Sequence, residues 1–208
     1  MLFPPASPLC YPHFRFRPEK AAEAIDLIAR ARPGLTQYFV GKFLYFADKA
    51  HFLDWGRPIT FDRYVAMKDG PVPSAVRNML MAAAGASAGL GEEHVETAKP
   101  HADELARHVR VELVVQPSGE RQHVYPLAAP PETRHLSGSD IECLEAVIAE
   151  MGDRNFSTLR RMSHEDEAWS EAWSRAMGRV APIDVCLWAQ PADRDAFRRQ
   201  ILEHGAAA

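Results

Sequence analysis

The chain has 208 residues, of which 47% are hydrophobic and 25% are charged, and its formal net charge is −4. This length suits one domain with one sizeable core, and the composition is that of an ordinary globular protein and excludes a disordered one. The negative net charge excludes a global positive field that would attract phosphates, so nucleic acid is disfavoured as the main partner.

The cysteines and the start of the chain bear on location. Cys10, Cys143 and Cys186 are far apart and form no C-x-x-C pair, which favours neither a disulfide framework nor a zinc site and fits a reducing cytosol. Residues 1–18 lack the pattern of a signal peptide, and no run approaches the roughly 20 apolar residues of a membrane span. We therefore expect a cytoplasmic protein without a membrane anchor, with residues 1–15 as an N-terminal extension.

Two helices are expected in the first quarter of the chain. The first starts at Pro18, places apolar residues on one stripe and ends before Pro33. Thr36 is placed to cap the second helix and Gly56 to end it, and between them apolar residues recur at steps of three and four. This second helix has the strongest pattern, so we expect it to be the central helix of the core.

The next segment mixes extended and helical signals. β-Branched and aromatic residues at 59–67 indicate a short extended segment. Residues 69–73 predict a turn, because their two prolines fix φ and restrict the residues before them. A third helix starts near Ser74. The small and polar residues 85–100 predict a loop, followed by a polar helix at about 101–107.

A β-hairpin is expected in the middle of the chain. Residues 109–115 alternate between apolar and mostly polar side chains, a turn follows, and residues 122–128 return. Because an isolated hairpin is marginally stable in water, we expect it to pack on the helices, with residues 59–67 as a third strand.

The C-terminal half predicts four further helices. Capping-box spacing marks the start of two of them, at Ser137 and at Ser163, each followed three residues later by aspartate. Ser157 opens a short helix between these two, and the last helix runs from about residue 192 to 204. In the two capping boxes, the serine side chain is expected to accept a backbone hydrogen bond from the first turn.

These elements together predict a mainly α fold. We expect one compact helical domain over residues 16–190, with a small antiparallel hairpin or three-stranded sheet packed on it, and a helix and tail at 191–208. Trp169 and Trp173 are four residues apart among small apolar residues, which favours the core. Trp55 and Trp188 stand at element ends, where we expect half-exposed side chains.

Motifs for catalysis and cofactor binding are weak in this sequence. It has no G-x-x-x-x-G-K-[ST] loop, no G-x-G-x-x-G loop after a strand and no G-x-S-x-G elbow. His164 begins an apparent H-E-x-x-H zinc motif, but Ala168 stands where the second histidine is needed. We therefore expect no catalytic residue, no metal and no cofactor.

Polar residues of the second helix and of the segment after it form a candidate site. Asp48 and His51 lie on one face of that helix, as a hydrogen-bonded pair at its end or as a carboxylate and imidazole pair for a metal or general base. We expect one polar cluster near the turn at residues 70–74, in which arginine pairs with carboxylate and either braces the turn or faces a partner. The cluster consists of Asp48, His51, Arg57, Arg63 and Tyr64.

Residues 42–80 read KFLYFADKAHFLDWGRPITFDRYVAMKDGPVPSAVRNML. This run resembles the Panacea domain family, the SocA-like antitoxins, because it has K-x-L-Y-x-A-D-x-x-H, G-R-P-I-T, R-Y-V-A-M and G-P-V-P-S in order. The similarity continues in PEKAAEAIDLIA before the run, and in LSGSDIECLEAVIAEMG and FSTLRRMSHEDEAW after it. It covers roughly residues 15–185.

The resemblance implies a cytoplasmic antitoxin of a bacterial or phage toxin–antitoxin pair that binds its cognate toxin directly. Some members act as adaptors that hand the toxin to an ATP-dependent protease, so a protease unfoldase is a further implied partner. The resemblance supplies no active site, and we expect no enzyme activity. The shared positions, as candidates for partner binding or structural support, are Tyr45, Asp48, His51, Arg57, Pro58, Arg63, Tyr64, Gly70, Pro71, Val72, Pro73, Ser74, His164 and Trp169.

Two alternatives to an antitoxin remain. A metal-dependent enzyme would use Asp48, His51 and His164. A DNA-binding regulator would need a basic helix, which this acidic chain does not display. The sequence predicts neither a nucleic acid nor a membrane as partner, and it leaves open the toxin's identity, the interface and the oligomeric state.

Overall fold

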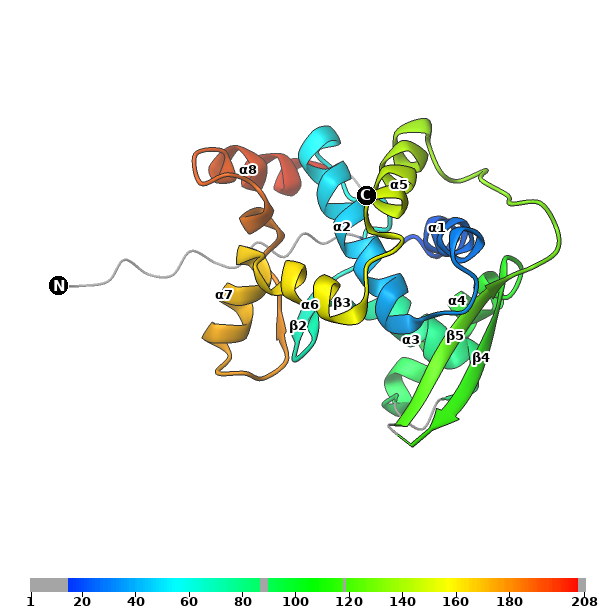
Figure 1. Ribbon diagram of the computed structural model, residues 1–208. Coiled ribbons are helices and arrows are strands. Elements are labelled where there is room, and N and C mark those ends of the chain that lie inside the picture. The colour runs from blue at the N-terminus through cyan, green and yellow to red at the C-terminus, as the bar shows by residue number, and fades with distance from the viewer. Residues whose placement is uncertain (1–14, 87–89, 118, 206–208) are drawn as a thin grey trace.

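The computed structural model describes residues 15–86, 90–117 and 119–205, and helices predominate in this part of the chain (Figure 1). The helices are α1 (Pro18–Ala31), α2 (Gln37–Trp55), α3 (Ser74–Ala83), α4 (Glu92–Leu105), α5 (Gly138–Met151), α6 (Phe156–His164), α7 (Glu167–Arg175), the 3-10 helix η2 (Val185–Trp188) and α8 (Arg194–Gly205). The strands are β1 (Leu35–Thr36), β2 (Tyr64–Met67), β3 (Gly70–Pro73), β4 (Val109–Gln116), β5 (Gly119–Pro126) and β6 (Ala181–Pro182). The predicted mainly α fold with minor β structure is confirmed.

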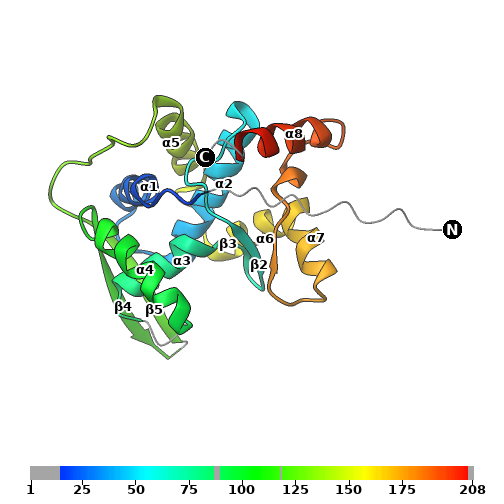
Figure 2. The ribbon, with the colours of Figure 1, turned by 180° about the vertical axis from the view of Figure 1, so that it is seen from behind.

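Helix α2 runs through the middle of the molecule, with other elements on both sides of it (Figures 1 and 2). Phe43 packs into one hydrophobic core, and Tyr45 and Phe52 pack into another. A helix that is apolar on several faces is expected in the interior of a protein. Gly56 ends α2 in the left-handed conformation (φ 72°), as predicted, whereas the side chain of Thr36 makes no capping hydrogen bond.

Two cores flank α2. The first core lies between α1, α2, α3, α5 and the β4–β5 hairpin, and its largest fully buried members include Ile25, Ile28, Phe43, Leu44, Ile59, Met79, Leu80, Leu105 and Leu144. The second core consists of Tyr45, Phe52, Tyr64, Ala66, Ala168, Trp169, Ala172, Ile183, Val185, Cys186, Trp188 and Ile201. Because α2 contributes to both, it joins the two halves of the fold.

The tryptophans separate into core and surface positions. Trp169 is 7% exposed in the second core, as predicted, and Trp173 is partly buried against it. Trp55 is exposed. The expectation for Trp188 is wrong: it is buried, because its indole N–H donates to the Tyr45 hydroxyl (2.9 Å) within the second core.

The predicted hairpin is confirmed as β4 and β5, but its third strand is not the expected one. β1 pairs with β5 through Leu35 and Val124, giving the order β1-β5-β4. The segment 59–67 instead supplies β2 to a second sheet, with the order β3-β2-β6. Both sheets are antiparallel. In each, a two-residue strand pairs with a hairpin that is distant from it in the sequence, β1 with β5 and β6 with β2.

The predicted turn at residues 69–73 is wrong in its extent. Only residues 68–69 form the turn, and β3 follows directly as the second strand of a hairpin with β2. Pro71 and Pro73 lack a backbone N–H, and a strand tolerates such residues at a sheet edge. β3 is an edge strand, which explains how both prolines fit.

The predicted loop at residues 85–100 is replaced over much of its length by α4, which includes Pro100. Ala98 is buried and packs with Met81 of α3 in a small third cluster. The polar sequence of α4 has no apolar stripe that would predict a helix. The helix is stabilised instead by packing against the neighbouring helix α3. Residues 87–89 lie outside the described part of the chain.

The C-terminal helices begin near the predicted positions, but two of their caps differ. The capping box at Ser137 is confirmed. Asn155, and not Ser157, caps α6, and Asp166 caps α7 while Ser163 lies inside α6. An Asn or Asp oxygen accepts the N–H bonds of a first turn as well as serine does, so sequence spacing alone did not discriminate among them.

The remaining predictions concern cysteines and membranes. Cys143 has a free, half-buried thiol, Cys186 lies in the second core, and Cys10 falls in the segment 1–14 outside the described residues. None of the helices in the described ranges combines the length and the apolar character needed to cross a bilayer.

Candidate functional site

Asp48 holds the segment that follows α2 against that helix. Its fully buried carboxylate accepts bonds from the backbone N–H of Ile59 (2.8 Å) and Thr60 (3.0 Å) and from the hydroxyls of Thr60 (2.6 Å) and Tyr64 (2.8 Å). Burial raises the pKa of Asp48, and the hydrogen bonds from Thr60, Tyr64 and Ile59 oppose that rise. One carboxylate thus fixes where the chain reverses and where β2 begins.

Asp62 performs a second bracing role that the sequence analysis missed. Its buried carboxylate accepts bonds from the N–H groups of Ala75 (2.9 Å) and Val76 (2.8 Å) at the start of α3, and from the N–H of Arg63 (2.6 Å). Burial raises the pKa of Asp62 to about 7 in spite of these three bonds. Asp62 stands 12 residues before Ser74, outside any local capping spacing, so only the fold reveals it as the cap of α3.

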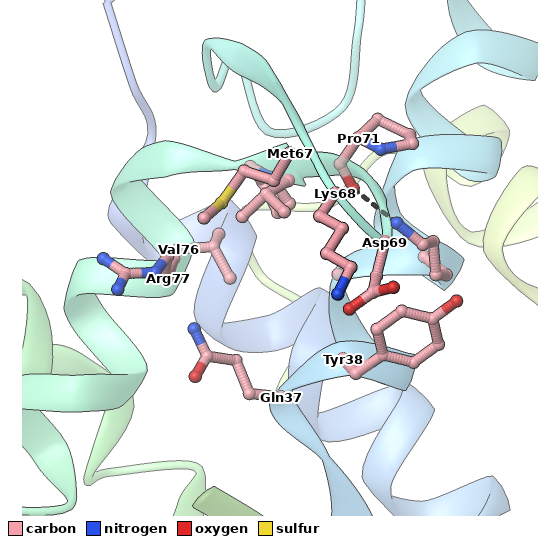
Figure 3. A pocket seen from close by; sticks show the side chains of 12 residues that line it. Gln37, Tyr38, Met67, Lys68, Asp69, Pro71, Val76 and Arg77 are labelled. Atoms are coloured by element: carbon pink, nitrogen blue, oxygen red, sulfur yellow. Dashed lines mark hydrogen bonds between the residues drawn. The ribbon is translucent and has the colours of Figure 1, made fainter. Parts of the chain in front are cut away.

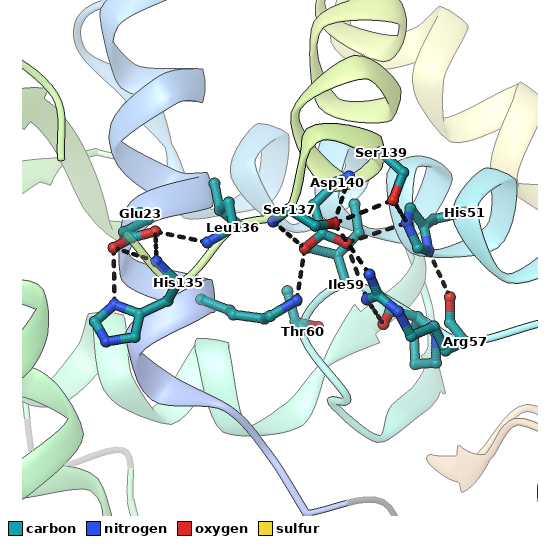
Figure 4. A network of polar contacts seen from close by, with 12 residues as sticks. Glu23, His51, Arg57, Ile59, Thr60, His135, Leu136, Ser137, Ser139 and Asp140 are labelled. Atoms are coloured by element: carbon teal, nitrogen blue, oxygen red, sulfur yellow. Dashed lines mark hydrogen bonds and ion pairs between the residues drawn. The ribbon is translucent and has the colours of Figure 1, made fainter. Parts of the chain in front are cut away.

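His51 and Arg57 belong to a different network, centred on α5 (Figure 4). The Nδ1 atom of His51 lies 2.8 Å from the carbonyl oxygen of Arg57, and its Nε2 atom lies 2.9 Å from the Ser139 hydroxyl. Because a carbonyl only accepts, Nδ1 carries the hydrogen and donates. Burial lowers the pKa of His51, and the Asp140 carboxylate, whose Oδ1 lies 3.1 Å from Nε2, opposes that change.

Asp140 is the charged centre of this network. It accepts from the backbone N–H of Ser137 (2.8 Å) and from Lys20 Nζ of α1 (2.5 Å), and Arg57 Nη1 lies 2.9 Å from its other oxygen. Burial raises the pKa of Asp140, but the bonds from Lys20 and Ser137 and the charges of Lys20 and Arg57 bring it below its usual value. The network therefore ties α1, the end of α2 and the start of α5 together.

The single polar cluster expected from the sequence is thus divided. Asp48 binds the segment at 59–64, whereas His51 and Arg57 bind α5, although Asp48 and His51 are three residues apart on α2. The expected pairing of arginine with Asp48 is replaced by pairing with Asp140. Arg63 is exposed, and its carbonyl accepts the Ser74 hydroxyl (2.9 Å), so its backbone supports the start of α3.

A pocket of about 260 Å³ opens between the first turns of α2, the β2–β3 hairpin and the start of α3 (Figure 3). Its lining combines apolar and charged side chains. It consists of Gln37, Tyr38, Gly41, Lys42, Met67, Lys68, Asp69, Pro71, Val72, Pro73, Val76 and Arg77. The G-P-V-P motif therefore forms one wall of this pocket.

Lys42 is one of the pocket residues that are absent from the candidates predicted from the sequence. Its side chain is buried, its Nζ donates to the Pro71 carbonyl (2.8 Å), and the same atom lies 5.0 Å from the centre of the Tyr38 ring. Burial lowers the pKa of Lys42 to about 7, against the opposing influence of Asp69. The available signal was a lysine within the apolar pattern of the central helix.

Gly70 is required by the packing around Lys42. It has φ 109°, and a Cβ atom there would lie 2.6 Å from Lys42 Nζ and 2.5 Å from Ser163 Oγ of α6. Pro73 also approaches α2 closely, because a Cβ at Gly41 would lie 3.2 Å from its ring. The two glycines therefore let the hairpin pack directly on α2 and α6.

His164 and Trp169 attach α6 and α7 to the same hairpin. Their rings stack with centroids 3.7 Å apart, and the Trp169 indole N–H donates to the Met67 carbonyl (3.0 Å). Burial lowers the pKa of His164, and the positive charges of Arg160 and Lys42 lower it further. Both residues have structural contacts in the second half of the fold.

The residues of the metal-enzyme alternative have separate partners. Asp48 accepts four hydrogen bonds, His51 contacts the Arg57 carbonyl and Ser139, and His164 stacks on the Trp169 ring of the other half of the fold. Within the described ranges, no group of three His, Cys, Asp or Glu side chains is arranged to hold a metal ion. The geometry of Asp48, His51 and His164 therefore gives this alternative no support.

The fold and these contacts define a helical domain whose shared motifs brace a hairpin and a surface pocket around a central helix. The family model for the antitoxin SocA-like, Panacea domain matches residues 40–170, which is more than half of the chain. The chain therefore belongs to this family of toxin–antitoxin systems, and the resemblance seen in the sequence is confirmed. No curated protein and no solved structure matches the chain.

Proposed function

We propose that this protein is an antitoxin that neutralises a cognate toxin by direct protein–protein binding. The match of the antitoxin family model over residues 40–170 is the observation that carries this proposal. The internal contacts of Asp48 and His51 support it, because they assign these polar residues to holding the fold and leave the surface to meet a partner. The motif residues on the pocket wall, among them Pro71 and Val72, are the proposed contact region.

Co-expression with the product of a neighbouring gene tests the proposal. The neighbouring protein alone should arrest growth, and this chain should restore growth and co-elute with it from a sizing column. Phe43→Ala, which empties a buried site, provides a control that should fail through loss of folding. Rescue without a complex, accompanied by a fall in toxin messenger RNA, would point to the DNA-binding alternative and overturn direct binding.

The adaptor role is a second, finer proposal, which only the family resemblance supports. If this chain delivers the toxin to an ATP-dependent protease, the toxin's half-life should shorten when the chain is co-expressed and recover when the protease is absent. An unchanged half-life in cells whose growth is restored would leave neutralisation by binding and remove the adaptor role.

A further inference from the structure

The pocket between α2, the β2–β3 hairpin and α3 has a charge opposite to that of the whole chain. The chain's net charge is −4, yet the lining contains Lys42, Lys68 and Arg77 and a single carboxylate, Asp69. That carboxylate already pairs with Arg160 Nε at 3.0 Å. The pocket therefore has a local excess of positive charge, which favours an anionic group.

The backbone adds to this positive character. The pocket lies against the first turn of α2, where the aligned peptide dipoles place a partial positive charge. The Thr36 side chain at that end accepts no hydrogen bond from the first-turn N–H groups. At α3 the situation differs, because Asp62 already accepts the N–H groups of its first turn. The α2 end is therefore the one available to an incoming acid.

The edge of β3 that faces away from β2 does not suit an added strand. Pro71 and Pro73 alternate with Val72, which lies opposite Val65 of β2. In an antiparallel ladder alternate residues address opposite edges, so the two prolines occupy the edge away from β2 and supply no N–H there. The Pro71 carbonyl on that edge already accepts from Lys42. A partner must therefore enter by a side chain and not by its main chain.

The apolar lining defines the rest of the occupant. Tyr38, Pro71, Pro73 and Val76 surround the space with hydrophobic surface, and Figure 3 shows Tyr38 and Val76 on opposite sides of it. Such walls suit the methylene groups of a glutamate or aspartate side chain and an apolar neighbour in the same segment. The charged end of that side chain would then reach the basic groups.

We infer that this pocket receives an acidic side chain from the toxin, with its carboxylate directed to Lys42 and with Lys68 and Arg77 attracting it at the rim. The inference rests on the proposed antitoxin function for the identity of the partner. The positive charge of the pocket supports an acidic occupant, and the missing N–H groups on the edge of β3 support entry by a side chain.

Binding at this pocket is coupled to a proton. The free Lys42 amine has its pKa lowered to about 7 by burial, and a bound carboxylate stabilises its charged form. Affinity should therefore fall about tenfold from pH 6 to pH 8, as the free amine loses its proton. The titratable and charged groups that act on Lys42 are Tyr38 of the same helix, Asp69 of the hairpin turn, and Arg160 and His164 of α6. Lys68 and Arg77 line the same pocket.

A capped tripeptide, acetyl-Leu-Glu-Leu-amide, tests the pocket without the toxin. In a titration followed by NMR, the backbone amides of Gly41, Val72 and Arg77 should shift saturably. The matched peptide with Gln in place of Glu should bind at least about tenfold more weakly, and Lys42→Met should reduce this preference and remove the pH dependence. Equal binding of the two peptides, shifts located elsewhere or no shifts at all would overturn the inference.

Charge reversals at the rim test the role of the pocket in the toxin complex. Arg77→Glu and Lys68→Glu should each weaken the complex at least about tenfold, whereas the matched controls Arg134→Glu and Lys99→Glu, at exposed sites outside the pocket, should not. If the wild-type chain binds the toxin and the reversals bind equally well, the pocket inference fails and the antitoxin function stands. If no toxin binds but the Glu peptide does, the proposed function fails and the carboxylate pocket stands.

Discussion

At the residue scale, a few buried carboxylates organise this protein by accepting several hydrogen bonds each. Asp48, Asp62 and Asp140 all accept from backbone N–H groups that lie far from them in the sequence or at a helix start. A buried donor left without a partner costs about 1–3 kcal/mol, which exceeds the net gain from a typical hydrogen bond. Losing one such carboxylate is therefore more damaging than losing any single bond.

Asp48→Ala should lower the free energy of unfolding by about 1–3 kcal/mol, because the N–H groups of Ile59 and Thr60 and the Tyr64 hydroxyl lose their acceptor. Urea denaturation measures this loss, and Asp48→Asn, which keeps one acceptor oxygen, should lose less. Toxin neutralisation should weaken only as far as folding does. An unchanged melting temperature with abolished binding would instead place Asp48 in the interface.

The buried Lys42 amine should produce a pH dependence of stability that Lys42→Met lacks. Burial lowers the pKa from 10.5 to about 7 in the folded state, so between these values the unfolded chain binds more protons. Stability therefore rises with pH across this window, by up to about 1.4 kcal/mol per pH unit from this group.

Thermal melts of the wild type and Lys42→Met at pH 7 to 9.5 measure this effect. The variant should have its greatest relative stability at the lower pH, and the difference should shrink as pH rises. Parallel curves would show that the Lys42 ammonium is not destabilised by burial. The range stops below the pH at which unfolded tyrosines ionise, because burial raises the pKa of Tyr45 and Tyr64 in the folded chain.

At the element scale, α2 was predictable because its apolar residues recur at helical spacing and Gly56 ends the pattern. β3 and α4 were not predictable from the sequence. β3 forms because its prolines occupy the edge of a sheet, and α4 forms because it packs on α3. The same contrast applies to the candidate site. The sequence identified Asp48 and His51 as polar residues on α2, but their separate partners depend on which element each one faces.

Phe43→Ala should lower the free energy of unfolding by about 3–5 kcal/mol, which is the range for emptying a buried phenylalanine site. Phe43 is 1% exposed in the first core, where α2 meets its neighbours. Chemical denaturation checks the prediction. Phe46→Ala, at a partly buried site on the same helix, should cost less, and equal effects would mean that burial on α2 does not determine the cost.

Asp62→Ala should destabilise α3 by about 1–3 kcal/mol, because the N–H groups of Ala75 and Val76 lose their acceptor. Hydrogen exchange at these two amides provides a local measurement. In the variant, their protection should fall by more than the protection of the α2 amides. Glu19→Ala, at the partly exposed first turn of α1, is a control that removes a carboxylate without an observed cap. If exchange at Ala75 and Val76 is unaffected, Asp62 is not their cap.

At the scale of the whole molecule, the family match and the folded unit differ in extent. The family model covers residues 40–170, yet α1 fills much of the first core and α8 packs on the second. The sequence placed a boundary at 190 because α8 lies beyond the resemblance. α8 is distant from α2 in the sequence, so the sequence does not predict their contact. In the structure, the centres of the Phe197 and Phe52 rings lie 5.1 Å apart.

We propose that α8 is an integral part of the domain. A chain that ends at Gln190 should lose roughly 3 kcal/mol or more, because it exposes the surface that Phe197 and Ile201 cover on Phe52 and Trp188. Thermal melting and the near-ultraviolet circular dichroism of the tryptophans, Trp188 among them, measure the loss. The point variant Phe197→Ala should reproduce part of it in the full-length chain, which separates lost packing from a general effect of truncation. A shortened chain with unchanged melting and an unchanged tryptophan spectrum would show that the domain ends at 190, as its sequence predicts.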